Sequence, residues 1–164
     1  MPDLVKILQR LLENQVEFVL IGGFAAVVHG SSLVTQDLDI CFLFNEANLS
    51  RLLKALRDLH PRHRSFKKTK ALEKEASKLL RYKNLYLETD WGRLDLLKET
   101  GGLGSYKILL SHTIQINLLG HPCKVLNIEA LIQAKEFMKR PKDKETILQL
   151  RAIQEKIKKS SSSP

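Results

Sequence analysis

Two aspartates inside an apolar run constrain the fold of this chain more than any other feature. Asp37 and Asp39 stand one residue apart in the segment DLDICFLF (37–44), whose other residues are apolar. Side chains alternate along a β-strand, so both carboxylates would point to the same side, with their Cα atoms roughly 7 Å apart. Burying two like charges on one strand is unfavourable unless a cation lies near them. The pattern therefore predicts a strand over residues 38–44 that presents two carboxylates to a bound cation.

A third isolated acid, Asp95, lies between leucines in the segment RLDLL (93–97). A single Asp in a strand commonly lies at an edge or pairs with Arg, so Asp95 alone is ambiguous. On a strand next to Asp37 and Asp39, it would complete a set of carboxylate oxygens, the ligands that Mg²⁺ prefers. Such a site can hold two ions, one that activates an attacking oxygen and one that stabilises a leaving phosphate. We therefore expect Asp37, Asp39 and Asp95 to bind two Mg²⁺ ions.

Glycines between a predicted strand and a predicted short helix suggest a phosphate site. Gly22 and Gly23 would let the backbone approach a phosphate, near the free N–H groups of a helix N-terminus. This signal is weak by itself, because many strand-to-helix turns contain glycine. Ser31 and Ser32 can add hydroxyl donors to a triphosphate, although an ordinary Gly-Ser turn explains them equally well.

The net charge of +9 is concentrated in one part of the chain. Between residues 60 and 84 there are nine Lys or Arg and two Glu, a net charge of +7, and the rest of the chain is close to balanced. This basic segment, Arg62–Lys83, predicts a polyanionic partner, with nucleic acid as the first candidate. The alternative is a solvated loop or helix face that binds nothing. Its basic residues are Arg62, Arg64, Lys67, Lys68, Lys70, Lys74, Lys78, Arg81 and Lys83.

Hydrophobic periodicity and turn residues predict an α/β fold, a mixed β-sheet flanked by helices with a helical C-terminal segment. The predicted strands cover residues 16–21, 38–44, 85–89, 93–97, 113–119 and 122–126. The predicted helices cover residues 4–14, 24–29, 49–59, 71–80, 128–138 and 142–158, with Asp3, Asn127 and either Asn45 or Asn48 as N-caps. Residues 61–70 and 101–104 have the composition of loops. We expect a core over 1–126 with a basic insertion at 60–84, a helical segment at 127–159 and a disordered tail at 160–164.

Composition indicates a folded protein without a membrane anchor. A hydrophobic fraction of 43% and a charged fraction of 27% suit an apolar core under a charged surface. Residues 1–13 lack an apolar signal core, and no apolar run approaches the roughly 20 residues of a membrane span. Cys41 and Cys123 have neither disulfide nor zinc spacing, so we expect free, buried thiols in a reducing compartment. Together these features predict a cytoplasmic location.

Four segments together resemble a known superfamily. They are IGGFAAVVHG (21–30), VTQDLDI (34–40), GRLDLL (92–97) and IEALIQAKEFMKRPKDKETILQL (128–150). The pattern resembles the nucleotidyltransferase superfamily typified by DNA polymerase β. Within it, the chain is most similar to the AbiEii-type nucleotidyltransferases, the toxins of bacterial toxin–antitoxin pairs. The resemblance spans most of the chain, is weakest over residues 60–84, and implies a minimal nucleotidyltransferase fold.

The resemblance implies roles for individual residues. Asp37, Asp39 and Asp95 would bind Mg²⁺, and Gly22 and Gly23 would hold the triphosphate of a nucleoside triphosphate. Two residues of the fourth segment match positions that the family places facing the site. Of these, Lys135 would neutralise phosphate charge, and Asp143 would orient Lys135.

The resemblance also implies an acceptor and a partner. It suggests RNA as the acceptor, the tRNA 3′ end first, bound through the basic segment, and a cognate antitoxin protein as a possible partner. One position departs from the family pattern: Leu33 stands where the family commonly has Arg, two residues before Thr35.

Alternative interpretations remain open at this point. A protein with the same fold could bind nucleotide or RNA without catalysis, which Leu33 favours. An enzyme could also nucleotidylate a protein, with the basic segment facing an acidic partner. Lys135 could be an ordinary helix-surface lysine, and Asp143 a helix N-cap. Trp91 and Tyr86 near the hairpin turn could stack on a base, although packing in the core is the more common role of such residues.

Overall fold

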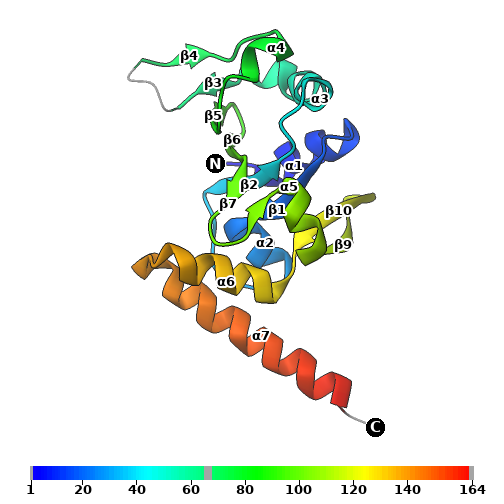
Figure 1. The fold of residues 1–164 in the computed structure, drawn as a ribbon, viewed down its shortest axis with the longest axis vertical. Helices are drawn as coiled ribbons and strands as arrows, with labels where there is room; N and C mark the ends of the chain where they lie inside the picture. The colour runs from blue at the N-terminus through cyan, green and yellow to red at the C-terminus, as the bar shows by residue number, and fades with distance from the viewer. Residues whose placement is uncertain (1, 65–67, 163–164) are drawn as a thin grey trace.

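The computed structural model describes residues 2–64 and 68–162, and eight of its strands form one mixed sheet (Figure 1). The strand order in this sheet is β4-β3-β5-β6-β2-β1-β10-β9. The strands are β1 Phe18–Ile21, β2 Asp37–Phe42, β3 Arg62–His63, β4 Lys70–Ala71, β5 Leu85–Thr89, β6 Gly92–Leu97, β9 Thr113–Leu118 and β10 His121–Leu126. The short strands β7 Glu99–Thr100 and β8 Gly104–Ser105 pair separately.

The helices begin where the sequence supplies capping side chains. Asp3, Asn45 and Asn127 each accept a hydrogen bond from a backbone N–H in the first turn of their helix, as predicted. Between the predicted alternatives, Asn45 is therefore the cap of α3. The helices are α1 Leu4–Glu13, α2 Gly22–Val28, α3 Glu46–Leu56, α4 Ala76–Leu79, α5 Tyr106–Leu109, α6 Ile128–Met138 and α7 Lys144–Ser162, with 3-10 turns η1 Arg57–Leu59, η2 Leu110–His112 and η3 Pro141–Asp143. Within the described ranges, none is both long and apolar enough to cross a membrane.

Strand pairing fixes which residues share a face of the sheet. β2 runs parallel to β6, and Asp39 lies opposite Asp95 in this register. Leu38 and Ile40, which alternate with the aspartates, are fully buried. The central strands therefore turn leucine and isoleucine toward one layer of the core and acids toward the other side.

Helices cover both sides of this sheet. α1 packs against α3 and contacts β2, β6 and β10, so its apolar face completes the core. α6 and α7 pack side by side, and α2 contacts both of them (Figure 1). Cys41 and Cys123 are free and buried in this core, as predicted. The mixed α/β fold with a helical C-terminal segment is confirmed.

The structure corrects three of the predicted elements. Residues 61–70 are not entirely loop, because β3 pairs with β5 and β4 pairs with β3. The predicted helix over 71–80 is reduced to the single turn of α4. α7 continues through Ser162, so the expected disorder over 160–164 is wrong for residues 160–162, and residues 163–164 lie outside the described part. No glycine or proline occurs between Lys144 and Ser162, so nothing in this stretch ends the helix earlier.

Candidate active site

Three carboxylates meet on one side of the sheet. One carboxylate oxygen from each of Asp37, Asp39 and Asp95 lies within 4.8 Å of the others. The parallel pairing of β2 and β6 produces this geometry, because it places Asp39 beside Asp95 with Asp37 two residues earlier on the same side. In the described part of the chain, no other group of three His, Cys, Asp or Glu side chains converges in this way. We refer to these three residues as the carboxylate cluster.

Two oxygens of the carboxylate cluster lack the hydrogen bonds that buried carboxylates normally accept. Asp37 Oδ1 and Asp95 Oδ1 are buried and accept no hydrogen bond from any described residue. Arg64 Nη2 lies 2.8 Å from Asp95 Oδ1 as an ion pair, and Arg93 Nη1 lies 4.0 Å from Asp37 Oδ1. Such oxygens suit a hard divalent cation, which prefers oxygen ligands and keeps several waters. The residues present therefore fit Mg²⁺.

The electrostatics of the carboxylate cluster also favour a bound cation. Burial raises the pKa of Asp39 to about 6, and the charges of Asp95 and Asp37 add to this rise, while Lys135 opposes it. Burial also raises the pKa of Asp95, although the positively charged Arg64 beside it works against this rise. A divalent cation would relieve the repulsion among the three carboxylates and would compete with a proton for Asp39.

Gly22 and Gly23 bring the backbone close to the strand that carries the aspartates. Gly22 has a φ of +69°, and a Cβ built there would lie 2.6 Å from Asp39 Oδ2. A Cβ on Gly23 would lie 2.9 Å from Thr35 Oγ1, whose hydroxyl donates to the Asp37 carbonyl oxygen. A side chain at either position would therefore displace the carboxylate cluster or its support. Triphosphate binding by the two glycines stays a prediction.

A cavity of about 290 Å³ opens beside the carboxylate cluster. Its wall contains Asp39 and Asp95 from the sheet, Lys135 from α6 and Arg140 from the turn after α6. Tyr86 of β5, which pairs with Asp95 across the strands, also lines it. Carboxylates and cations around one small cavity suit a metal-bound phosphate, because the cluster would hold the metal and the cations the phosphate oxygens.

Asp143 binds the two cationic side chains of this cavity, those of Lys135 and Arg140. Lys135 Nζ donates to Asp143 Oδ1 at 3.4 Å, and Arg140 Nε donates to Asp143 Oδ2 at 2.7 Å. Burial would raise the pKa of Asp143, but the hydrogen bond from Arg140 and the charge of Lys135 outweigh it and lower that pKa. Lys135 is buried, so it is not the helix-surface lysine that the sequence left open. Asp143 is absent from the cavity wall, and its contacts are those of a residue that positions Lys135 and Arg140.

Ser31 and Ser32 make their contacts with α7. Ser31 Oγ donates to Gln149 Oε1 at 2.9 Å, and the Ser32 backbone N–H donates to the same oxygen at 3.0 Å. Gln149 Nε2 donates in return to Ser32 Oγ at 3.1 Å. Leu33 lies next in this loop, and its backbone N–H donates to Ser31 Oγ. Neither serine lines the cavity, so their predicted contact with a triphosphate would require the loop to move.

Two cations at the site were missed by the sequence analysis as site residues. Arg140 stands three residues before Asp143, and this i,i+3 spacing of opposite charges is a signal that could have pointed to it. Arg64 was counted only as part of the basic segment, because no sequence pattern indicated that β3 joins the sheet. Tyr86 was expected in the core, yet it is partly exposed and lines the cavity.

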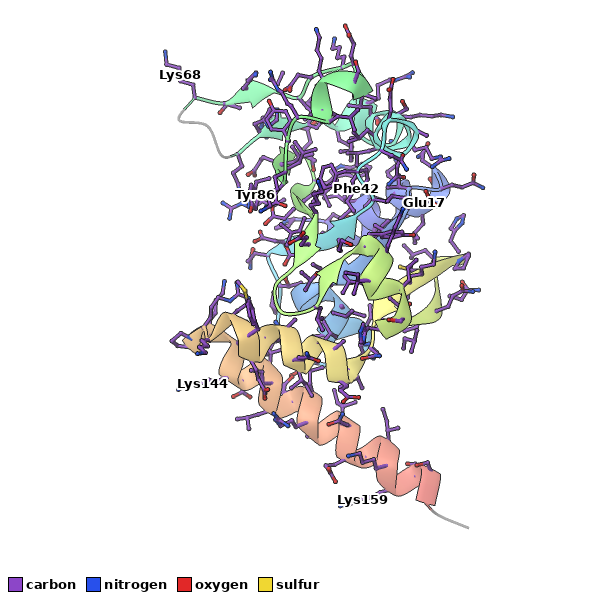
Figure 2. All side chains as sticks on the ribbon, in the orientation of Figure 1. Glu17, Phe42, Lys68, Tyr86, Lys144 and Lys159 are labelled. Atoms are coloured by element: carbon purple, nitrogen blue, oxygen red, sulfur yellow. The ribbon has the colours of Figure 1, made fainter. Side chains whose placement is uncertain are left out.

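The basic segment forms an outlying part of the molecule, made of β3, β4 and α4 (Figure 1). Some of its charges are paired within it: His63 Nε2 lies 2.6 Å from Glu73 Oε1, and Arg81 Nη2 lies 3.3 Å from Glu73 Oε2. Lys68, Lys74 and Lys83 have no carboxylate partner among the residues the structure describes. Figure 2 shows Lys68 projecting from the end of this region. Lys67 lies outside the described residues.

A larger open groove of about 860 Å³ lies between α3 and the basic segment. Lys54, Arg57 and Lys74 line it together with apolar residues, and Glu73, already paired with His63, is its only described carboxylate. The groove shares no lining residue with the cavity at the carboxylate cluster. Of the two, the smaller cavity is the candidate site, because Asp39 and Asp95 of the carboxylate cluster line it and Asp95 Oδ1 accepts no hydrogen bond from a described residue.

Comparisons with known proteins support the fold. No protein-family model matches the chain, and no curated protein sequence matches it. Among solved structures, the chain is similar to the crystal structure of "a putative nucleotidyltransferase" from Thermotoga maritima, with a TM-score of 0.53 and 19% sequence identity. The similarity covers 89% of this chain and 88% of the other. The two proteins therefore share a fold over nearly their whole lengths.

Proposed function

We propose that the protein is a metal-dependent nucleotidyltransferase that transfers a nucleoside monophosphate from a nucleoside triphosphate to an acceptor hydroxyl. The carboxylate cluster carries this proposal, because its three carboxylates converge and two of its buried oxygens lack hydrogen bonds. Asp39 and Asp95 of the cluster line a cavity that also contains Lys135 and Arg140. The fold shared with the Thermotoga maritima protein supports it, since the name of that protein is "putative nucleotidyltransferase".

The proposed reaction is an in-line displacement at the α-phosphorus. The acceptor hydroxyl gives up its proton to solvent and its oxygen forms a bond to phosphorus. The bond between phosphorus and the bridging oxygen breaks, and pyrophosphate leaves with the electron pair. Asp37, Asp39 and Asp95 would hold two Mg²⁺ ions, which when bound activate the acceptor hydroxyl and stabilise the leaving group. Lys135 and Arg140 would neutralise charge on the phosphate oxygens. The protein does no covalent work, so positioning and electrostatics lower the barrier.

We propose RNA as the acceptor, with the tRNA 3′ end as the first candidate. Unpaired Lys68, Lys74 and Lys83 support a polyanionic partner. The resemblance to AbiEii-type toxins supports tRNA and suggests a cognate antitoxin. A protein acceptor is the second candidate, in which case the basic segment would face an acidic partner.

Label transfer identifies the acceptor. Purified protein is incubated with each α-labelled nucleoside triphosphate, Mg²⁺ and either total RNA or lysate. The control is an Asp37→Ala/Asp39→Ala variant, matched by Glu75→Ala/Glu155→Ala, which removes two exposed acids. We expect label in RNA with the wild type and the matched variant only. Label in protein would mean that the acceptor is a protein and not RNA. No label under any condition would mean that the chain is a non-catalytic binding protein, the alternative that Leu33 favours.

A further inference from the structure

Arg64 reaches the carboxylate cluster from the edge of the basic segment. It directly follows β3, and its backbone N–H donates to the Tyr86 carbonyl oxygen at 2.8 Å. Its side chain crosses β5, where Nη1 donates to the Leu87 carbonyl oxygen at 3.2 Å, and Nη2 ends 2.8 Å from Asp95 Oδ1. The guanidinium carbon lies 5.9 Å from the centre of the Tyr86 ring. Arg64 is therefore held by β5 beside Asp95 of the carboxylate cluster.

Arg64 and a metal ion would compete for the same carboxylate. Asp95 Oδ1 is one of the two buried oxygens that accept no hydrogen bond from described residues, and Arg64 is its ion-pair partner. A divalent cation bound to Asp95 would lie a few ångströms from the Arg64 guanidinium, and the two positive charges would repel each other. Because this repulsion falls with distance, it favours movement of Arg64 away from the metal. Arg64 can move away, because 27% of its side chain is exposed. Lys135 cannot move in the same way, since it is 9% exposed and held by Asp143.

The strand order places Arg64 on the opposite side of the carboxylate cluster from the glycines. In the order β3-β5-β6-β2-β1, Gly22 follows β1, whereas Arg64 follows β3 beyond β6. If the glycines hold the triphosphate, the side of the carboxylate cluster toward β5 and β6 stays open for the acceptor. The neighbouring cross-strand row alternates in charge, since Asp37 lies opposite Arg93, Arg93 opposite Glu88, and Glu88 opposite Arg62.

We propose that Arg64 changes its anionic partner during the reaction: it pairs with Asp95 in the metal-free protein and with a backbone phosphate of a single-stranded RNA acceptor when metal is bound. This inference rests on the proposed function and names how its acceptor is held. Tyr86, which lies beside Arg64 and lines the cavity, offers a ring on which the last base of the acceptor can stack. Metal binding and RNA binding are thereby coupled through one side chain, and such coupling is reciprocal.

Metal titration tests the first half of the inference. Mn²⁺ binding to the full chain is measured by calorimetry for the wild type, Arg64→Ala, Arg64→Lys and Lys107→Ala, an exposed charge-matched control outside the basic segment. A neighbouring cation typically lowers the proton affinity of a carboxylate about tenfold or more, so we expect Arg64→Ala to bind Mn²⁺ about tenfold more tightly than the wild type. Arg64→Lys should lie between them and Lys107→Ala should match the wild type. Thermal unfolding of each variant verifies that it is folded.

Binding of a fluorescent single-stranded RNA oligonucleotide tests the second half. Mn²⁺ should strengthen RNA binding to the wild type, and this gain should shrink about tenfold in Arg64→Ala while Arg64→Lys retains part of it. Unchanged Mn²⁺ affinity in a folded Arg64→Ala, or an unchanged gain in RNA binding, would overturn the inference and leave the proposed function intact. The Asp37→Ala/Asp39→Ala control should bind no Mn²⁺. If the wild type also binds no Mn²⁺, the proposed function itself is wrong.

Discussion

Asp39 carries a charge that the surrounding fold disfavours in the absence of metal. Its carboxylate is close to those of Asp37 and Asp95, and burial is the first cause of its raised pKa. Gly22 has no side chain where a Cβ would clash with this carboxylate, so the backbone is shaped to tolerate the cluster. Local instability of this kind is typical of functional sites, where binding of a ligand offsets it.

Replacing Asp39 by Asn should stabilise the metal-free protein. The substitution keeps the shape of the side chain and removes one of three repelling charges, so we expect a gain of about 1–3 kcal/mol in the free energy of unfolding at pH 7. The measurement is urea unfolding in the presence of a chelator, together with loss of Mn²⁺ binding. Asp58→Asn is the control, because Asp58 pairs with Arg10 at the surface and its lowered pKa predicts a small loss of stability. A less stable Asp39→Asn would show that the three carboxylates do not repel one another in the folded state.

Metal affinity should rise with pH through the pKa of Asp39. That pKa is raised to about 6, so the folded protein holds a proton on Asp39 at pH 5 that the metal must displace. We expect Mn²⁺ affinity to fall about tenfold for each pH unit below about 6, and to level off above it. The same shift makes the metal-free protein less stable as pH rises from about 4 to 6, since the folded state then binds more protons than the unfolded one. Calorimetry in two buffers of different ionisation enthalpy detects the released proton, and equal affinity at pH 5 and pH 7 would contradict the raised pKa.

At the scale of elements, the parts that local sequence determines were predictable. Alternating leucines around Asp95 and the turn at Asp90–Gly92 predict the hairpin of β5 and β6, and Asn127 predicts the start of α6. The strand pattern and the resemblance predicted that Asp37, Asp39 and Asp95 lie together. The register that places Asp39 beside Asp95 depends on the parallel pairing of β2 with β6.

The parts that depend on tertiary contacts were not predictable. β3 and β4 have two residues each and no periodicity, so the pairing of β3 with β5 and of β4 with β3 left no signal in the sequence. The placement of Arg64 at Asp95 depends on that pairing and was missed with it. The contact of Gln149 with Ser31 joins residues far apart in the chain, which no local pattern reveals.

Gln149→Ala should loosen the loop that leads into β2. The substitution removes the hydrogen bonds of Gln149 to Ser31 and Ser32 and leaves the buried Ser31 hydroxyl without its acceptor. We expect a loss of about 1–3 kcal/mol in the free energy of unfolding and weaker Mn²⁺ binding, because the loop positions Asp37. Gln154→Ala on the same helix is the matched control, since Gln154 makes no side-chain hydrogen bond within the described residues. Equal stability of the two variants would mean that α7 does not support the loop.

At the scale of the whole molecule, the charge is divided between two regions. The carboxylate cluster lies between the sheet and α6, and the excess positive charge lies beyond β5 in the basic segment. In Figure 2, the labelled Tyr86 lies between Lys68 of the basic segment and Lys144 at the start of α7. An RNA strand bound to the basic segment would therefore reach the candidate active site over β5 and β6.

RNA binding should depend on the unpaired lysines of the basic segment. Exchanging Lys68, Lys74 and Lys83 for Ala should weaken binding of a single-stranded RNA and reduce the slope of log affinity against log salt by about 2, at about 0.7 per lost phosphate contact. Lys107→Ala/Lys156→Ala/Lys158→Ala removes the same charge from exposed positions elsewhere and should change the slope little. Fluorescence anisotropy over a salt series measures both slopes. Affinity that is indifferent to salt would remove RNA as the partner.

The most direct test of the central claim compares α-labelled and γ-labelled nucleoside triphosphate in the same reaction with Mg²⁺ and RNA. If the carboxylate cluster catalyses nucleotidyl transfer, the wild type should transfer the α-label to RNA and release the γ-label as pyrophosphate. The Asp37→Ala/Asp39→Ala variant should do neither. Transfer of the γ-label to RNA would show phosphoryl transfer instead. Equal transfer of the α-label by the wild type and the Asp37→Ala/Asp39→Ala variant would show that the carboxylate cluster is not the active site.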